Sequence, residues 1–509
     1  MQICFFSRAE AQVKLFPELG DASLSNQFEI RINDQEAIVE RMKKLDIPIN
    51  YAQLTYDTSV PLEIEIKIDN PINTYTISPQ RKKLNGVVDN NKLTFVVHDA
   101  DYLLVKINDL EDLFLLINPL VDYKAQIKNK EIIDITSYGV DKTGQQIETQ
   151  KLQQAINDAS SKHAVLYFPK GIYRTGQLNM RSNMTVYLSD GALIYGSINP
   201  KDYVDKSLAR MDSVSNFDYT DKSLIRMDSI SNFQLLGNGT IDGAGWAGLR
   251  KNGGWHYLIF ATYSKKVIID GPVLRDPAFW NTRIFCSNNI HLKNIKILNN
   301  RPYEGWTNTD GIDFDSSSDC SLVNAVIHGG DDNLVVKGLD TKRRFVTEKI
   351  LFDNILTMSN SAATKIGTET SVEYFKDITF SNIDVARCER GLVITGYDSA
   401  HIENVLFENI TIEDFVFKGH SPRLIDFEIS DQCSWRETSG TCTINNVKIK
   451  DLNVLCSING VIAQILGRTN QFDINNVQIN NIQIQGKKAT LSDIDLKTNE
   501  FVKNLIEKD

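Results

Sequence analysis

Residues 290–297 read IHLKNIKI, and the same eight-residue pattern of alternating apolar positions around a central Asn recurs four more times. The further copies are CSLVNAVI (320–327), ILFDNILT (350–357), ITFSNIDV (378–385) and VLFENITI (405–412). Alternation of this kind predicts a strand with one buried face. The Asn recurs after 30, 30, 28 and 27 residues, and a strand repeated at this period predicts a right-handed parallel β-helix, a solenoid whose coils stack on one another.

The Asn at a fixed place in each coil suits this fold. Its side chain tolerates the left-handed conformation of a turn and can hydrogen-bond to the Asn of the coils above and below. Gly271, Asp451 and Asn481 stand at that place in three further copies, VIIDGPVL (267–274), VKIKDLNV (447–454) and VQINNIQI (477–484). An antiparallel sandwich is the alternative, but it predicts strands every 8 to 12 residues or so with hairpin signals between them. The β-helix is therefore favoured.

The chain is predicted to be all-β with two domains, as its 509 residues allow. Residues 1–128 contain strand-like runs without the long period and predict a small β-sandwich domain. These runs are LEIEIKI, KLTFVV, YLLVKI and LFLLI. Residues 129–509 are predicted to form the β-helix.

The two ends of the solenoid and one internal duplication carry further predictions. A helix at about 148–160 would cover the open first coil, because it carries Leu152, Ala155, Ile156 and Ala159 at helical spacing. Residues 491–509 are expected to be a short helical or frayed tail. DYVDKSLARMDSVSNF (202–217) is followed at once by the near-copy DYTDKSLIRMDSISNF (218–233), and a 16-residue period is too short for a coil. We expect this duplication to loop out of the solenoid.

Composition limits the functional classes. The net charge of −10 and the pI near 5.4 argue against nucleic acid or an anionic membrane as partner. No apolar run approaches the length of a membrane span. The first residues, MQICFFSRAEAQ, end like a signal-peptide cleavage site after a short apolar stretch. A secreted or periplasmic protein is expected, unless this likeness is accidental.

Seven cysteines are too few and too scattered for a disulfide framework or a zinc site. Only Cys433 and Cys442 are close enough in sequence to close a loop. Cys286, Cys320 and Cys388 fall inside or beside strand units and are expected to be core thiols.

Three carboxylates lie about one coil apart in NTDGIDFDSSSDCSLVNAVIHGGDD, residues 308–332. Asp310 and Asp331 should therefore lie on neighbouring coils, about 4.8 Å apart along the axis plus a lateral offset. Gly329 and Gly330 permit a bulge or turn that directs both Asp331 and Asp332 outward. Crowding three acids should raise the pKa of at least one of them.

Such a set has the chemistry that glycoside hydrolysis requires. One protonated carboxylic acid protonates the leaving oxygen, and ionised carboxylate activates water on the opposite side of the sugar. A single Asp in a solenoid more often caps a turn or binds structural Ca²⁺. The trio as a whole favours catalysis.

Several motifs resemble those of the polygalacturonase family, glycoside hydrolase family 28, over about residues 130–485. They are NTDGID (308–313), GGDDNLVVK (329–337), RDPAFWN (275–281) and the entry region 138–196. The resemblance implies a pectin-lyase-like β-helix and hydrolysis with inversion, without a cofactor or metal. It implies Asp331 as the general acid and Asp310 with Asp332 as the residues that activate water.

Two motifs of the pectin-cleaving members are replaced in this chain. The GHG motif corresponds to SAATKIGTET (361–370), with Ala362 or Ala363 at the His, and the RIK motif corresponds to GLVITG (391–396). Val393 and Thr395 therefore stand at the basic positions. Because a uronate carboxylate needs a cationic partner, a neutral substrate such as an α-glucan is expected. Glycoside hydrolase family 49, the dextranases and isopullulanases, shares the Asp trio, lacks those basic residues and has an N-terminal β-sandwich similar to residues 1–128.

Further residues are predicted to line the cleft. Lys337 follows the Asp pair at strand spacing. Lys365 and Glu369 lie in the segment where the pectin-cleaving members carry the His. Trp280 and Trp306 are candidates to stack on sugars, although buried Trp is commoner. The other candidate contacts are Arg275, Arg387, Arg390 and Tyr397, whereas His328 is expected to be structural.

The sequence thus predicts an inverting glycoside hydrolase whose partner is a neutral polysaccharide or oligosaccharide. The alternative is a galacturonan or rhamnogalacturonan hydrolase whose cationic subsite comes from Arg387, Arg390 or Lys365. A noncatalytic glycan-binding β-helix is the rival from another class. A polysaccharide lyase is less favoured, because it needs Ca²⁺ carboxylates and an Arg or Lys base.

Overall fold

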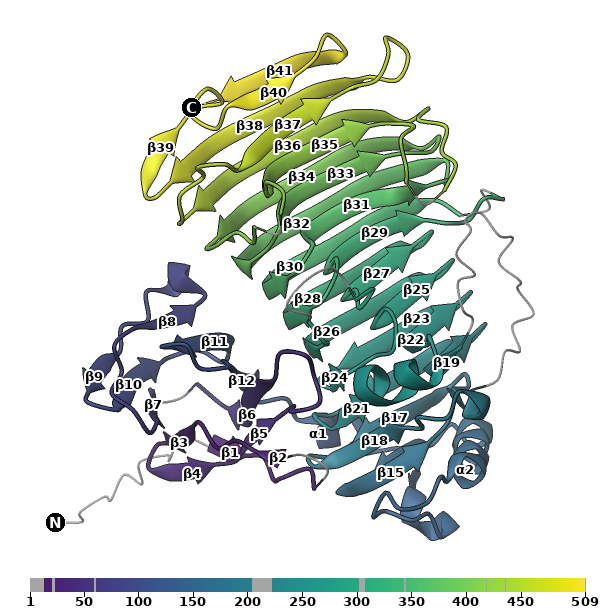
Figure 1. Cartoon of the computed structure of the whole chain (residues 1–509). Helices are drawn as coiled ribbons and strands as arrows, with labels where there is room; N and C mark the ends of the chain where they lie inside the picture. The colour runs from purple at the N-terminus through teal and green to yellow at the C-terminus, as the bar shows by residue number, and fades with distance from the viewer. Residues whose placement is uncertain are drawn as a thin grey trace, which may run out of the picture. The chain divides into compact units, whose positions relative to one another are not determined.

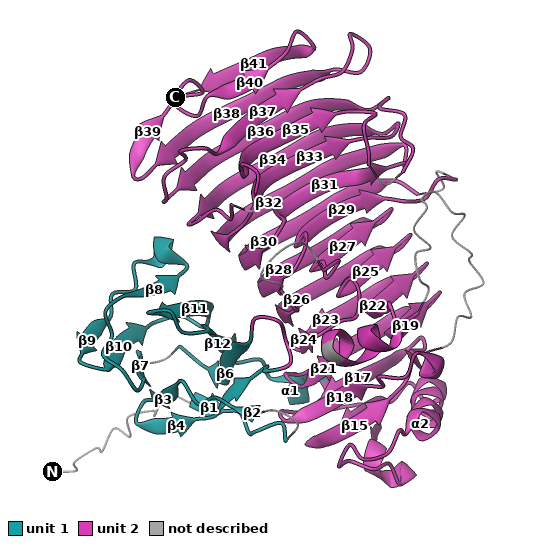
Figure 2. Cartoon of the chain, in the orientation of Figure 1, with its two compact units in different colours: residues 1–43, 48–126 teal, residues 44–47, 127–509 magenta. Residues whose placement is uncertain are grey.

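The computed structural model describes residues 13–20, 23–58, 61–203, 222–301, 307–342, 345–417, 419–434 and 436–508. Residues 1–12, Trp306 and residues 204–221 of the duplication lie outside these ranges. The chain divides into two compact units, residues 1–43 with 48–126 and residues 44–47 with 127–509 (Figure 2). The boundary lies two residues before the predicted one, and the sequence gives no sign that residues 44–47 join the second unit.

The first unit consists of two sheets that share one hydrophobic core. One sheet runs in the order β2 (Ser23–Leu24), β5 (Val39–Arg41), β6 (Ile49–Tyr56), β12 (Asp112–Pro119), β11 (Tyr102–Ile107) and β8 (Tyr75–Ser78), with β1 (Val13–Leu15) beside β6. The other runs β4 (Gln35–Ala37), β3 (Glu29–Ile32), β7 (Leu62–Lys67), β10 (Lys92–Val97) and β9 (Val87–Asp89). The four predicted strand runs are β7, β10, β11 and β12. The predicted N-terminal β domain is therefore confirmed.

The second unit is a solenoid in which successive coils add parallel strands to two long sheets, as Figure 1 shows. In the described part of the chain, the 18-stranded sheet comprises β13 (Ile132–Asp134), β14 (Val165–Phe168), β15 (Gly171–Thr175), β17 (Met184–Leu188), β18 (Ala192–Gly196), β20 (Ser231–Leu236), β21 (Thr240–Asp242), β23 (Lys265–Asp270), β24 (Val273–Arg275), β26 (Asn288–Leu298), β28 (Ser318–Gly329), β30 (Thr347–Ser359), β32 (Tyr374–Arg387), β34 (His401–Ile412), β36 (Thr443–Val454), β38 (Ile474–Ile484), β39 (Lys487–Ala489) and β41 (Val502–Lys508).

The 11-stranded sheet, within the same described ranges, comprises β16 (Leu178–Asn179), β19 (Ser223–Asp228), β22 (Tyr257–Thr262), β25 (Thr282–Phe285), β27 (Ile312–Asp315), β29 (Leu334–Gly338), β31 (Ala362–Thr370), β33 (Arg390–Gly396), β35 (Arg423–Ile429), β37 (Ile462–Leu466) and β40 (Leu496–Thr498). Apolar side chains of both sheets form one continuous core. The predicted parallel β-helix is confirmed.

Two stacks of like residues keep the coils in register. Asn324 donates to Asn294 at 2.7 Å and accepts from Asn354 at 3.1 Å, and all three have φ between 54° and 56°. Phe352 and Phe380 stack at 5.1 Å with nearly parallel rings in the core. The predicted Asn ladder is thus confirmed from Asn294 to Asn354, whereas at the next coil Asn382 donates to Asp353 at 2.7 Å.

The ends of the solenoid agree with prediction at one side and differ at the other. Helix α2 (Thr149–Ser161) buries Leu152, Ala155, Ile156 and Ala159 in the core, as predicted. The prediction of a helical or frayed tail is wrong, because β40 and β41 continue the two sheets. Leu496, Val502 and Leu505 pack against the core, and this burial favours strands over a tail.

One other expectation also needs correction. The second copy of the duplication does not loop out where it is described, because it supplies β19 and the first half of β20, with Leu224 and Met227 buried. Cys433 and Cys442 are free thiols rather than a disulfide. Cys286, Cys320 and Cys388 are buried free thiols, as predicted.

The remaining helical turns are short. They are η1 (Gln80–Lys82), α1 (Tyr123–Ile127), η2 (Ile135–Tyr138), η3 (Pro200–Asp202), η4 (Gly245–Leu249) and η5 (Arg250–Asn252). No helix in the described part of the chain has both the length and the apolar character needed to cross a membrane.

Replacing Asn324 should separate the two contributions of the ladder. Asn324→Ala removes two side-chain hydrogen bonds and places Ala in a left-handed conformation, so we expect the free energy of unfolding to fall by about 2 to 4 kcal/mol. Asn324→Gly removes the same bonds but tolerates the backbone, so its loss should be smaller. Urea unfolding of both variants measures the difference. Equal stability of all three proteins would contradict the role of the ladder.

Candidate functional site

The three predicted Asp residues gather where two strands of the 11-stranded sheet begin. Asp310 lies two residues before β27, and Asp331 and Asp332 lie in the turn between β28 and β29. The amide of Gly311 donates to the carbonyl of Asp332 at 2.9 Å, so the two segments are on adjacent coils. A Cβ on Gly330 would lie 2.2 Å from the carbonyl oxygen of Asn300. The predicted turn therefore depends on glycine at this close approach.

Asp332 is held by four donors. Its Oδ1 accepts from the Ser361 hydroxyl at 2.6 Å, the Ala362 amide at 2.9 Å and the Arg390 guanidinium at 3.2 Å. Its Oδ2 accepts from Lys365 Nζ at 2.5 Å. Burial alone would raise the pKa of Asp332, but the charges of Lys365, Arg390 and Lys337 outweigh burial and lower that pKa. Asp332 is therefore the ionised member of the trio.

Asp331 has the opposite preference although it is the next residue. Burial and then the charge of Asp332 raise the pKa of Asp331 to about 6. Its Oδ1 accepts from the amide of Asp332 at 2.9 Å. Up to a pH of about 6, the site therefore holds a protonated carboxyl group, Asp331, beside an ionised carboxylate, Asp332. Acid–base catalysis uses such a pair.

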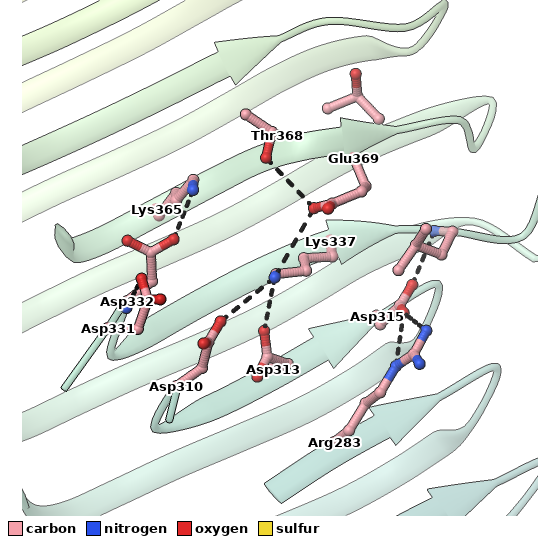
Figure 3. A network of polar contacts seen from close by, with 12 residues as sticks. Arg283, Asp310, Asp313, Asp315, Asp331, Asp332, Lys337, Lys365, Thr368 and Glu369 are labelled. Carbon is pink, nitrogen blue, oxygen red and sulfur yellow. Dashed lines mark hydrogen bonds and ion pairs between the residues drawn. The ribbon is translucent and has the colours of Figure 1, made fainter. Parts of the chain in front are cut away.

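Lys337 lies at the centre of a second group of contacts, shown in Figure 3. Its Nζ is 3.4 Å from Asp310, 3.4 Å from Asp313 and 3.8 Å from Glu369. It also lies 3.6 Å above the ring of Trp280, whose side chain is only 4% exposed. The structure thus brings Lys337, Glu369 and Trp280 to the trio, but as buried partners of one another.

The carboxyl groups around Lys337 differ in their proton affinity. Burial raises the pKa of Asp310 well above its usual range, against the charge of Lys337 and with the help of Asp313 and the other two Asp. Burial raises the pKa of Asp313 to about 7, against Lys337 and Arg283. Burial would also raise the pKa of Glu369, but Lys337, Lys365 and Arg436 outweigh it and lower that pKa to about 2.

Sequence reasoning missed Asp313 and Asp315 as part of this network. Both are fully buried, and Asp315 accepts two bonds from Arg283, at 3.0 Å and 2.5 Å. They alternate with Ile312 and Phe314, which lie in the core. Acidic and apolar residues alternate in IDFD, residues 312–315. This alternation is the sequence signal that both carboxylates lie on the outer face of the strand, beside Lys337.

The remaining predicted residues lie in other contacts. Arg275 is buried in an ion pair with Asp242, at 2.6 Å, between β24 and β21 of the 18-stranded sheet. Tyr397 follows β33, and its amide donates to Thr370. Arg387 lies 3.8 Å from Asp414. His328 is fully buried and bonds to Asn299 through Nδ1, which agrees with a structural role, and Trp306 lies outside the described residues.

Two of the three positions that lack basic residues, Ala362 and Val393, lie beside other cations, whereas Thr395 pairs with Glu428. Ala362 on β31 pairs with Arg390 on β33, and Lys365 pairs with Val393. Each cation is thus one rung, about 4.8 Å, from a replaced position. Across the described ranges, no group of three or more His, Cys, Asp or Glu side chains is arranged to hold a metal ion.

Comparison with known proteins places this site in a family. Glycosyl hydrolases family 28 matches residues 160–499. A probable polygalacturonase of Vitis vinifera is 27% identical over 315 residues, which are 58% of this chain and 63% of that protein. The exo-poly-alpha-D-galacturonosidase of Dickeya chrysanthemi is 33% identical over 121 residues, 23% of this chain and 20% of that protein. The chain therefore matches less than two thirds of the length of either relative.

Solved structures show the same fold at low identity. The polygalacturonase from Erwinia carotovora ssp. carotovora has a TM-score of 0.55 at 16% identity and covers 75% of this chain and 97% of its own. Dex49A from Penicillium minioluteum has a TM-score of 0.53 at 12% identity and covers 97% of this chain and 96% of its own. Since the family match spans the Asp trio and most of the solenoid, the chain belongs to glycosyl hydrolases family 28.

Proposed function

We propose that this chain hydrolyses glycosidic bonds in a pectic, uronate-containing polysaccharide, with inversion at the anomeric carbon. The observation that carries the proposal is the pair of adjacent carboxyl groups with opposite proton affinity. Burial keeps the pKa of Asp331 at about 6, and Lys365 with Arg390 keeps Asp332 ionised. Asp331 is the proposed general acid, and Asp310 with Asp332 is proposed to activate the water.

The proposed step balances in a single displacement. The proton of Asp331 moves to the glycosidic oxygen as its bond to the anomeric carbon breaks. A water molecule held by Asp310 and Asp332 attacks the opposite face of the anomeric carbon, and one proton of that water passes to Asp332, which is the ionised member of the pair. Asp332 supplies the negative charge, because four donors stabilise its ionised form.

Relatives and strand register support a uronate substrate over the neutral one that the sequence favoured. Two curated relatives that match over long segments are a probable polygalacturonase and an endo-polygalacturonase. Arg390 and Lys365 stand one rung from Ala362 and Val393, the positions that lost basic residues. Arg390 keeps 21% of its side chain exposed and is the proposed partner of a substrate carboxylate.

A neutral glycan remains the second candidate because of two acidic residues on the next coil. Val393 pairs with Asp426, and Thr395 pairs with Glu428. A carboxylate of the substrate at this coil would meet like charge, whereas sugar hydroxyls would find acceptors. The uronate and neutral candidates therefore differ in the sugar that would bind beside Asp426 and Glu428.

The first test removes the proposed acid. Asp331→Asn should lower kcat by roughly a hundredfold to ten-thousandfold, because the leaving oxygen loses its proton donor, while oligosaccharide binding persists. Reducing-sugar release and calorimetric binding to oligogalacturonate measure the two effects. Binding without hydrolysis by the unaltered protein would instead support a noncatalytic glycan-binding β-helix.

The second test uses pH. Since Asp331 must be protonated to act, kcat/KM should fall above a pH of about 6. The charge of Lys365 lowers the pKa of Asp331, so Lys365→Met should raise that pKa and move the alkaline limb to higher pH. It should also lower kcat roughly ten- to a hundredfold, since a charge-assisted hydrogen bond to Asp332 is lost.

Lys365→Arg is the matched control for this change, because it keeps the charge. Its alkaline limb should stay near that of the unaltered protein. A limb that does not move in Lys365→Met would show that Asp331 is not the group that titrates there.

The third test concerns the substrate carboxylate. If Arg390 binds a uronate, Arg390→Gln should raise KM for polygalacturonate roughly tenfold or more and leave KM for the carboxyl-reduced polymer nearly unchanged. Lys376→Gln, which removes a cation that pairs with Glu403 on the 18-stranded sheet, is the control. Preferred cleavage of the reduced polymer or of dextran by the unaltered protein would favour the neutral candidate.

A further inference from the structure

We propose that Trp255 is a sugar-stacking platform for substrate residues that lie beyond the scissile bond, on the side of Asp310 toward earlier coils. This inference rests on the proposed function, because its ligand is the carbohydrate chain held at the Asp trio. Neither the motifs nor the predicted cleft residues include Trp255.

Strand register places Trp255 along the line of the site. The amide of Asn281 donates to the carbonyl of Asp310 at 2.9 Å. The amide of Leu258 donates to the carbonyl of Trp280 at 3.4 Å. Trp280 is thus one rung before Asp310, and Tyr257 is two rungs before it, about 10 Å along the axis. Trp255 stands two residues before Tyr257, the first residue of β22, so it precedes the strand as Asp310 precedes β27 and lies two residues farther out than the register position of Asp310. The same edge of the sheet therefore carries both residues.

Exposure distinguishes Trp255 from the aromatic residues beneath it. Trp255 is 43% exposed, whereas Trp280 is 4% and Tyr257 is 1% exposed. Trp280 was the sequence-based candidate for stacking, but its ring supports Lys337 instead. Trp255 therefore offers indole surface to solvent at a place where the buried rings do not.

Neighbouring side chains fix the orientation of Trp255. The guanidinium of Arg250 lies 3.8 Å over its ring and 4.7 Å over the ring of Trp246. Arg250 also donates to the carbonyl of Thr307, three residues before Asp310. The ring of Phe279 meets Trp255 edge-on at 5.9 Å. An exposed ring held in this way loses little conformational freedom when it binds a ligand.

The same aromatic contacts continue to the catalytic carboxyl groups. Phe279 stacks on Trp280 at 5.2 Å with an interplanar angle of 12°. Trp280 lies under Lys337, which is 3.4 Å from Asp310. Asp310, Lys337, Trp280, Phe279 and Trp255 thus contact one another in this order. Trp255 is the solvent-exposed member, and these contacts hold it in a fixed position relative to Asp310.

An indole ring binds the apolar face of a sugar and does not distinguish charged from neutral sugars. A large, rigid aromatic surface with a polar edge suits a ligand such as a pyranose, which has one apolar face and polar groups elsewhere. Trp255 should therefore contribute equally to uronate and neutral units. Its contribution should depend on chain length, because only an oligosaccharide that extends beyond the scissile bond reaches it.

Kinetics with short and long oligogalacturonates test the inference. Trp255→Ala should raise KM for a hexasaccharide roughly two- to tenfold, with kcat nearly unchanged and with little effect on a trisaccharide. Trp255→Phe should recover part of the loss. Tyr374→Ala is the matched control, because Tyr374 is 36% exposed on β32 of the other sheet, and both substrates should keep their KM.

Equal KM changes for the short and long substrates, or none for either, would overturn the inference while leaving hydrolysis intact. Binding of the hexasaccharide to Asp331→Asn, with and without Trp255→Ala, separates the two proposals. Weaker binding in the double variant supports the platform even if hydrolysis of pectic substrates fails. An unaltered protein that neither binds nor cleaves any oligosaccharide tested would overturn both.

Discussion

The in-register stacking of parallel coils is the constraint on which the rest of this structure depends. Each rung of a parallel sheet is separated from the next by about 4.8 Å, so residues some 20 to 30 positions apart become neighbours. The Asn ladder supports this register through a left-handed Asn in each of these coils and through hydrogen bonds between the side-chain amides of Asn294, Asn324 and Asn354. A shift of one residue would turn Lys337 or Lys365 toward the core, where a charge has no partner.

Once the register is fixed, the charges of the site follow from burial. Five carboxyl groups are buried here, Asp310, Asp313, Asp331, Asp332 and Glu369. They experience the charges of five cations, Lys337, Lys365, Arg390, Arg283 and Arg436. Because an uncompensated charge is expensive away from water, protons are retained on those carboxyl groups whose burial outweighs the attraction of the nearby cations. Asp332 and Glu369 have lowered pKa values, and Asp310, Asp313 and Asp331 have raised ones. The proposed mechanism needs a proton on Asp331. Asp331 retains this proton because the nearby cations do not fully offset the cost of burying its negative charge.

Much of the solenoid was predictable, because its signals are local and periodic. Alternation gave the strands, the Asn period gave the coils, and helical spacing gave α2. The tail and the duplication were mispredicted, because their strands depend on a neighbouring coil that short-range patterns do not reveal. The trio was predictable from spacing alone. The role of Lys337 was not, because its buried partners Asp313 and Glu369 come from different coils.

Trp280 shows why residue type alone did not identify the sugar-binding surface. An aromatic ring beside catalytic acids can meet the substrate or support a buried cation, and exposure decides between these uses. The ring under Lys337 lies in a site where that lysine offsets the charges of three carboxyl groups. Removing it would weaken packing and cation binding together, so its effect on catalysis would reach Asp310 through Lys337. Both indole rings hold a cation, Lys337 over Trp280 and Arg250 over Trp255. Exposure distinguishes the two rings, because Trp280 is 4% exposed and Trp255 is 43% exposed.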